Sequence, residues 1–220
     1  MRSRALGLLS TATLRWYFAS AWLYTAADVD LDGSRIIVAS HQSVLDLAVA
    51  FAATSALDRR FAMWAHPDIL RVAPFLRGAD LLEASTDPAG FHTLIARSRE
   101  LVRRDGAPTD LWVFPEGRYL HRRANAAIHP GTKLLLRAAP EVPLLVAGID
   151  YSLYRSGRPH CVVELSSLDR TADLRAALAD ANAHAASRAA SDLPELAPPI
   201  VPLSDLARWS RPWTLAASGS

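Results

Sequence analysis

The sequence contains very little cysteine and very little lysine. Cys161 is the single cysteine, so no disulfide can form within the chain and no cluster of cysteines can hold a metal ion. Lys133 is the single lysine, and arginine therefore supplies nearly all of the 24 basic residues. Because 22 acidic residues almost balance them, the formal net charge is only +2, which does not favour a nucleic-acid-binding protein. A location facing the cytosol fits the scarcity of cysteine.

Long uncharged hydrophobic runs are also missing. The most apolar segment near the N-terminus, residues 5–24, carries Arg15 near its middle and is diluted by hydroxyl residues, so it is a poor membrane span. On a helix its cationic and aromatic residues separate onto different faces, which is typical of a helix lying on a membrane surface. A helix that covers the protein's own core would show the same stripe. We therefore expect an amphipathic N-terminal helix within residues 1–28, with a peripheral membrane role as one of its two explanations.

The rest of the sequence alternates short β-branched or aromatic runs with helical patterns. Half of the 220 residues are apolar, which is enough for one domain with a substantial core. The alternation predicts a single α/β domain over residues 29–192, with a mostly parallel central sheet flanked by helices, and a proline-rich tail over residues 193–220. Strands are expected at residues 35–39, 61–64, 78–83, 111–114, 142–149 and 161–165, and helices at residues 43–56, 67–75, 87–106, 131–139 and 171–190.

Ionisable residues follow two of the expected strands. His41 comes after the first strand and Glu116 after the fourth, and the carboxyl ends of parallel strands are where ligands gather. Asp46 lies five residues beyond His41 and could bond one ring nitrogen, leaving the other to accept a proton. A local explanation is equally available: Ser43 could be a helix N-cap, with Asp46 completing a capping box. The spacing alone does not choose between a catalytic pair and an ordinary helix start.

Three motifs taken together resemble a known family. His41-x4-Asp46, Phe114-Pro115-Glu116-Gly117 and the apolar residues 142–147 are similar, in order and spacing, to motifs of the glycerophospholipid (lysophosphatidic acid) acyltransferases, over roughly residues 35–150. The resemblance implies a glycerol-3-phosphate acyltransferase-like fold. It also implies transfer of a fatty acyl chain from acyl-CoA or acyl carrier protein to a hydroxyl of a lysophospholipid-like or other amphiphilic acceptor, at the cytoplasmic side of a membrane. His41 would be the general base and Asp46 its orienting partner, with no cofactor beyond the thioester co-substrate and no metal.

The residues that would bind the acceptor depart from the family pattern. By the resemblance, Glu116 and Gly117 would help to position the acceptor, and the family usually continues F-P-E-G-T-R-S. Here Arg118 follows Gly117 directly, one position early. Either Arg118 still reaches an acceptor phosphate, or Arg122 or Arg123 replaces it, or the acceptor has no phosphate.

A second departure widens the choice of acceptor. Within residues 64–85 the family pattern typically offers a lysine near the start and an arginine after a strand, but here those places are occupied by Ala65-His66 and by residues 82–85 (Leu-Glu-Ala-Ser). A sugar, an aminolipid or a glycosylated terpenoid is therefore as open as a phosphate-bearing acceptor. A catalytically silent lipid-binding member is one rival interpretation, suggested by the altered residues after the Phe-Pro-Glu-Gly motif. Metal-dependent hydrolysis is another. Its ligands would be His41, Asp46, Asp110 and Glu116.

Overall fold

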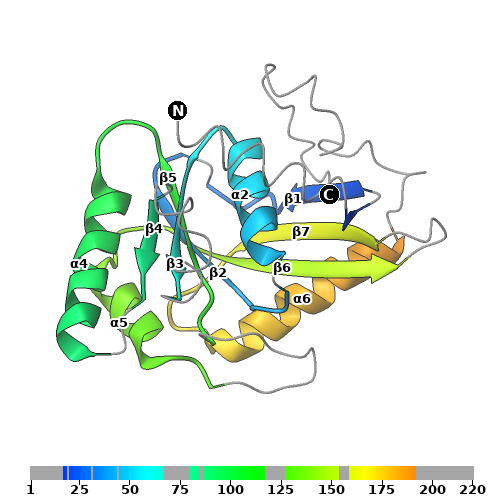
Figure 1. Cartoon of the computed structure of the whole chain (residues 1–220). Coiled ribbons are helices and arrows are strands. Elements are labelled where there is room, and N and C mark those ends of the chain that lie inside the picture. Colours follow the sequence, from blue (N-terminus) through cyan, green and yellow to red (C-terminus); the bar gives the residue numbers. More distant parts are fainter. Residues whose placement is uncertain are drawn as a thin grey trace.

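Seven strands form one sheet in the part of the chain that the structure describes (Figure 1). The structure is a computed structural model and describes residues 17–18, 20–30, 32–43, 45–66, 80–84, 87–116, 127–153 and 159–191. The strands are β1 (Ser20–Thr25), β2 (Arg35–Ala39), β3 (Arg60–Ala65), β4 (Asp80–Glu83), β5 (Thr109–Val113), β6 (Leu144–Leu153) and β7 (Pro159–Ser167). The helices are α2 (Asp46–Ala56), α4 (Pro88–Arg103), α5 (Pro130–Ala138) and α6 (Leu174–Ser191).

The sheet is mostly parallel. Its order is β1-β7-β6-β2-β5-β3-β4, and the five strands from β6 to β4 in that order run parallel to their neighbours. The long strand β7 pairs antiparallel with β6, and β1 pairs parallel with β7 at the edge. The expected single α/β domain, with a mostly parallel sheet flanked by helices, is therefore confirmed.

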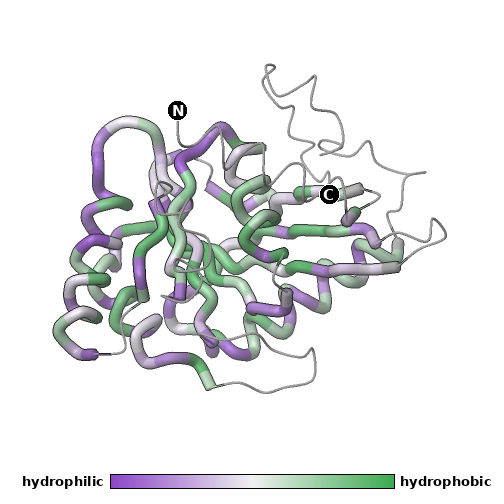
Figure 2. The backbone as a smooth tube through the Cα atoms, viewed as in Figure 1, coloured by the Kyte–Doolittle hydropathy of each residue, from purple (hydrophilic) through white to green (hydrophobic). Residues whose placement is uncertain are grey.

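Helices cover both faces of the sheet, and each face has its own apolar core. Alternate residues of a strand point to opposite faces. Ile37 accordingly packs in a cluster with α2, while Ile36 and Val38 pack in a second cluster with α4, α5 and α6. All five residues of β2 are buried, as is usual for a central parallel strand. Figure 2 shows the hydrophobic colouring concentrated along the central strands.

The expected N-terminal helix is wrong for its last residues, because Ser20–Thr25 form strand β1. In this segment Ala21 and Leu23 enter the core cluster on the α2 side, whereas Trp22 and Tyr24 belong to a cluster on the α6 side. That two-residue alternation and the aromatic content favour a strand, and pairing with β7 satisfies its backbone. Residues 20–25 therefore belong to the sheet rather than to a helix over residues 1–28.

Three of the expected segments lie partly or wholly outside the described residues. Residues 1–16 of the expected N-terminal helix, the expected helix at residues 67–75 and the proline-rich tail at residues 193–220 all lie outside the described residues. Among the helices that the structure does describe, none combines the length and the apolar character needed to span a bilayer.

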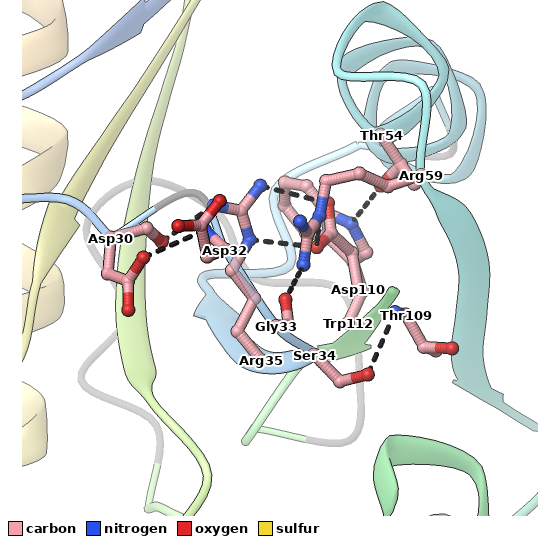
Figure 3. Close-up of polar contacts among 10 residues, drawn as sticks. All are labelled: Asp30, Asp32, Gly33, Ser34, Arg35, Thr54, Arg59, Thr109, Asp110 and Trp112. Atoms are coloured by element: carbon pink, nitrogen blue, oxygen red, sulfur yellow. Dashed lines mark hydrogen bonds and ion pairs between the residues drawn. The ribbon is translucent and has the colours of Figure 1, made fainter. Parts of the chain in front are cut away.

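A buried charged cluster joins the amino-terminal ends of three neighbouring strands (Figure 3). Arg35 of β2 contacts both carboxylate oxygens of Asp110 of β5, with distances of 2.8 Å from Nε and 3.3 Å from Nη2. Arg59, which precedes β3, donates from Nε to the same carboxylate at 2.5 Å and also donates to the carbonyl of Gly33. Arg35 and Asp110 are fully buried. Charges so deeply buried are tolerated only when they are paired and hydrogen-bonded. The cluster therefore holds together the amino-terminal ends of β2, β5 and β3, whereas His41 and Glu116 follow the carboxyl ends of β2 and β5.

Candidate active site

His41 and Asp46 meet in the loop between β2 and α2. The imidazole Nδ1 of His41 lies 2.8 Å from Oδ2 of Asp46, and the Asp46 side chain is fully buried while that of His41 is 15% exposed. Since Nδ1 faces the carboxylate, Nε2 is the ring nitrogen that would exchange a proton with a substrate. The contact expected from the five-residue spacing is present.

The same carboxylate also organises the loop. Oδ2 of Asp46 accepts the backbone N–H groups of Gln42 at 2.8 Å and Ser43 at 2.9 Å. Helix α2 begins at Asp46 with Leu45 as its N-cap, so Ser43 is not the expected N-cap, and the Ser43 hydroxyl instead accepts the Leu45 N–H at 3.1 Å. The acidic half of the expected capping box is thus present and its serine half is not. A single carboxylate shapes the helix start and orients the histidine, so the two explanations of the sequence are compatible.

An aromatic ring packs against the imidazole. Phe114 follows the last residue of β5, and its ring centroid lies 4.6 Å from that of His41 with an interplanar angle of 30°. The ring is therefore fixed at its edge by a hydrogen bond to Asp46 and across its face by Phe114.

Glu116 lies beside His41 and Asp46. This was expected, because His41 and Glu116 follow the carboxyl ends of the paired parallel strands β2 and β5. Its Oε2 accepts the backbone N–H of His41 at 3.4 Å, and it also interacts with the side chain of Ser40. Burial raises the pKa of the Glu116 carboxyl above its ordinary value, and these hydrogen bonds oppose the rise. The carboxyl is held next to the backbone of the histidine.

Helix α6 contacts the site from the face of the sheet opposite to α2. Asn182 donates from Nδ2 to the Ser40 hydroxyl at 3.2 Å, and its Oδ1 accepts the N–H of Ile149 at 3.2 Å. The helix approaches β6 closely because Gly148 has no side chain: a Cβ there would lie 2.0 Å from a carbonyl oxygen of α6. The carbonyl of Ile149 in turn accepts from the side chain of Gln42 at 3.3 Å. Asn182 lies within an alanine-rich helix, and no local pattern in the sequence indicated its role.

Tyr151 of β6 is a second residue that the sequence did not reveal. Its hydroxyl donates to Oδ1 of Asp46 at 2.5 Å. A polar aromatic residue near the carboxyl end of a third strand was the available signal, because that strand ends at the same edge of the sheet as β2 and β5.

Backbone N–H groups at the start of α2 are commonly considered as donors to a developing oxyanion. Here the N–H groups of residues 41–43, 45 and 46 are already engaged. Asp46 accepts from Gln42 and Ser43, Glu116 accepts from His41, and the Leu45 and Asp46 N–H groups bond to the side chain and the carbonyl of Ser43. The described part of this loop therefore stabilises the His41–Asp46 pair, called the dyad below, rather than presenting its N–H groups to a substrate oxygen.

The structure does not bring together all of the residues that the sequence suggested. Asp110 lies at the opposite edge of the sheet, bound to Arg35 and Arg59, so the metal-ligand set that joined it to His41, Asp46 and Glu116 is wrong. No three or more histidine, cysteine, aspartate or glutamate side chains among the described residues are grouped so that they could hold a metal ion. The remaining predicted acceptor and phosphate residues lie outside the described residues. They are Gly117, Arg118, Arg122 and Arg123.

Comparison with known proteins identifies the fold. The structure is similar to the crystal structure of the 1-acyl-sn-glycerophosphate (LPA) acyltransferase PlsC from Thermotoga maritima, with a TM-score of 0.56 over 86% of this chain and 80% of that chain. The two sequences are 16% identical, so the likeness establishes a shared fold. No protein-family model and no curated protein matches the sequence. The chain therefore has the α/β fold of the PlsC acyltransferase, and its activity has to be argued from the site.

Proposed function

We propose that this protein is an O-acyltransferase that moves a fatty acyl chain from an acyl thioester to a hydroxyl of a lysophospholipid-like or other amphiphilic acceptor. The observation that carries the proposal is the contact between His41 and Asp46, at the carboxyl edge of a sheet with the PlsC fold and with Glu116 alongside. The donor is acyl-CoA or acyl carrier protein, and the protein works peripherally at the cytoplasmic side of a membrane.

In this mechanism His41 acts as a general base. Nε2 takes the proton of the acceptor hydroxyl while the hydroxyl oxygen attacks the thioester carbonyl carbon. The new C–O bond forms, the C–S bond breaks, and the imidazolium then gives the proton to the leaving thiolate. Asp46 keeps the proton of the neutral ring on Nδ1 and stabilises the imidazolium that forms. The products are an ester and a free thiol, and no acyl-enzyme is required.

Glu116 is placed to help position the acceptor. Its carboxyl is half-buried, bonded to the backbone of His41, and raised in pKa mainly by burial. In a partly dry site, a hydrogen bond between this group and a substrate hydroxyl is stronger than it would be in water. We propose that Gly117 and Arg118 continue the acceptor site, with Arg122 and Arg123 as phosphate or donor contacts.

A two-way screen tests the proposed function. Acyl-CoA and acyl carrier protein donors are each paired with lysophosphatidic acid and with phosphate-free sugar, aminolipid and glycosylated terpenoid acceptors. Thiol release and the mass of the product are measured together. We expect one thiol released per acyl ester formed, and release that depends on the acceptor. Donor binding without an ester product in any pairing would contradict the proposal and favour a catalytically silent lipid-binding protein.

The same screen separates acyl transfer from hydrolysis and defines the acceptor. Free fatty acid released equally with and without acceptor would indicate a thioesterase instead. An ester formed only with lysophosphatidic acid would assign a phosphate-bearing acceptor, whereas an ester formed with the phosphate-free compounds would assign the alternative class.

A further inference from the structure

Tyr151 reaches the catalytic carboxylate from a third strand. His41 follows β2 and Asp46 opens α2, whereas Tyr151 lies on β6, more than a hundred residues away in the chain. Its hydroxyl donates to Oδ1 of Asp46 at 2.5 Å. The contact therefore depends on the parallel pairing of β2 with β6, which places His41, Asp46 and Tyr151 at the same end of the sheet.

The two oxygens of Asp46 have different partners. Oδ2 accepts from the His41 ring and from the backbone N–H groups of Gln42 and Ser43. Oδ1 accepts from Tyr151. The Asp46 side chain is fully buried, so without the phenol its Oδ1 would lose this donor in a place that water does not reach. The tyrosine completes the solvation of the carboxylate and opposes rotation of its plane.

Tyr151 is itself held in place and kept protonated. Its ring stacks on Phe18 with centroids 5.5 Å apart and an interplanar angle of 12°. Burial raises the pKa of its phenol well above 10, and the neighbouring Cys161 and Asp46 raise it further. The phenol therefore donates its hydrogen bond throughout the pH range in which a histidine base works.

Taken with the proposed function, on which it rests, this geometry leads to one inference: we propose that Tyr151 is the positioning residue of the dyad. Through Asp46 it fixes the direction of the His41 ring and sets how strongly the carboxylate attracts the imidazolium. Tyr151 does not touch the reacting atoms and so acts only through Asp46.

Removing the phenolic hydroxyl should have a defined electrostatic consequence. A carboxylate that loses a hydrogen-bond donor carries a more concentrated charge and stabilises a neighbouring cation more strongly. The imidazolium would then persist to higher pH, and the neutral base would appear later in a titration. The other titratable groups around the pair are Glu116 beside His41, Cys161 next to Tyr151, and Asp150 acting on Cys161. Burial raises the pKa of the Cys161 thiol well above its ordinary value, so the thiol stays neutral and its interaction with the phenol carries no charge that Tyr151→Phe would change.

The test compares Tyr151→Phe with Tyr24→Phe. Both changes remove one phenolic hydroxyl and keep the ring, and Tyr24 lies on edge strand β1 beneath the Arg188 guanidinium, at 4.7 Å. For Tyr151→Phe we expect kcat to fall about tenfold, the KM for the thioester to stay the same, and the acid limb of the kcat/KM profile to move up by about half a pH unit. Tyr24→Phe should match the wild type in all three.

A second readout does not depend on activity. The histidine ring signals are followed by NMR against pH, with His41→Ala used to assign the signal of His41. We expect that signal to titrate at higher pH in Tyr151→Phe and to be unchanged in Tyr24→Phe. This readout stands even if the acyltransferase proposal fails. A His41 titration and pH profile identical to wild type in Tyr151→Phe, whether or not its thermal stability falls, would overturn the positioning role.

Discussion

Oδ2 of Asp46 lies 2.8 Å from Nδ1 of His41 and accepts two backbone N–H groups of the intervening loop as well. The carboxylate that orients the His41 ring is therefore also the group that shapes the turn between β2 and α2. Charge and geometry at this position cannot be changed separately, and this dependence leads to the first prediction.

Asp46→Asn should damage both catalysis and folding. An amide keeps the size of the side chain but removes the charge that stabilises the imidazolium, so kcat should fall about a hundredfold or more. If the NH2 group faces the N–H groups of Gln42 and Ser43, their bonds are lost too, and the free energy of unfolding should fall by roughly 1–3 kcal/mol.

Turnover and urea unfolding check both effects of Asp46→Asn. Asp58→Asn is the matched control, since Asp58 is exposed and has a φ of 53°, a conformation that asparagine tolerates well. A kcat for Asp46→Asn within a few-fold of this control would contradict the role given to Asp46.

Glu116→Gln should change the pH dependence of stability. Burial raises the pKa of Glu116 in the folded state, so the folded protein holds this proton more tightly than the unfolded chain does. Its contribution to stability is therefore fully present below about pH 4 and is lost as the pH rises through the folded-state pKa. Glutamine carries no charge, so the variant should be the more stable protein at neutral pH, and the difference should vanish at low pH. Thermal unfolding from pH 4 to pH 8 measures this, and a constant difference across the range would show that burial does not govern the group.

Asn182→Ala should weaken the support behind the site. The change removes the bond to the Ser40 hydroxyl, which connects α6 to the loop carrying His41, and the bond to the Ile149 N–H, which connects α6 to β6. We expect stability to fall by about 1–2 kcal/mol and kcat/KM for the acceptor to fall several-fold, because Ser40 also interacts with Glu116. Asp180→Ala, at an exposed position of the same helix, is the control. Equal kinetics in the two variants would show that Asn182 matters to stability alone.

Asp110→Asn should lower the free energy of unfolding without altering the activity of the folded protein. Asp110 neutralises two buried guanidiniums at the edge of the sheet away from His41 (Figure 3), so its loss should cost about 3–5 kcal/mol. Asp80→Asn removes the partner of Arg60 in a partly exposed pair, at 3.8 Å, and should cost less than about 1 kcal/mol. Denaturant unfolding compares the two. A small cost at Asp110 would mean that the buried cluster does not hold the strand ends together.

The sequence predicted that His41 and Glu116 lie close together, because residues that follow parallel strands meet at the same end of the sheet. His41 and Glu116 lie two and three residues after the buried strands β2 and β5, and parallel strands bring such positions to the same end of the sheet. Strand β1 was missed because a six-residue segment with two aromatic side chains fits a helical stripe as well as a strand, and only pairing with β7 decides between them. Tyr151 and Asn182 carry no local motif, and they contact the site only through the register of β6 and the close approach of α6. The pairing of Arg35 with Asp110 also carries no local motif, and the metal hypothesis therefore wrongly included Asp110.

The central claim is tested most directly by His41→Ala in an acceptor-dependent thiol-release assay, with His184→Ala, an exposed histidine on α6, as the matched control. If His41 is the general base, turnover should fall at least about a hundredfold while the unfolding transition stays close to that of the wild type, and His184→Ala should retain full activity. Thiol release by a folded His41→Ala protein at a rate near that of the wild type would contradict this account.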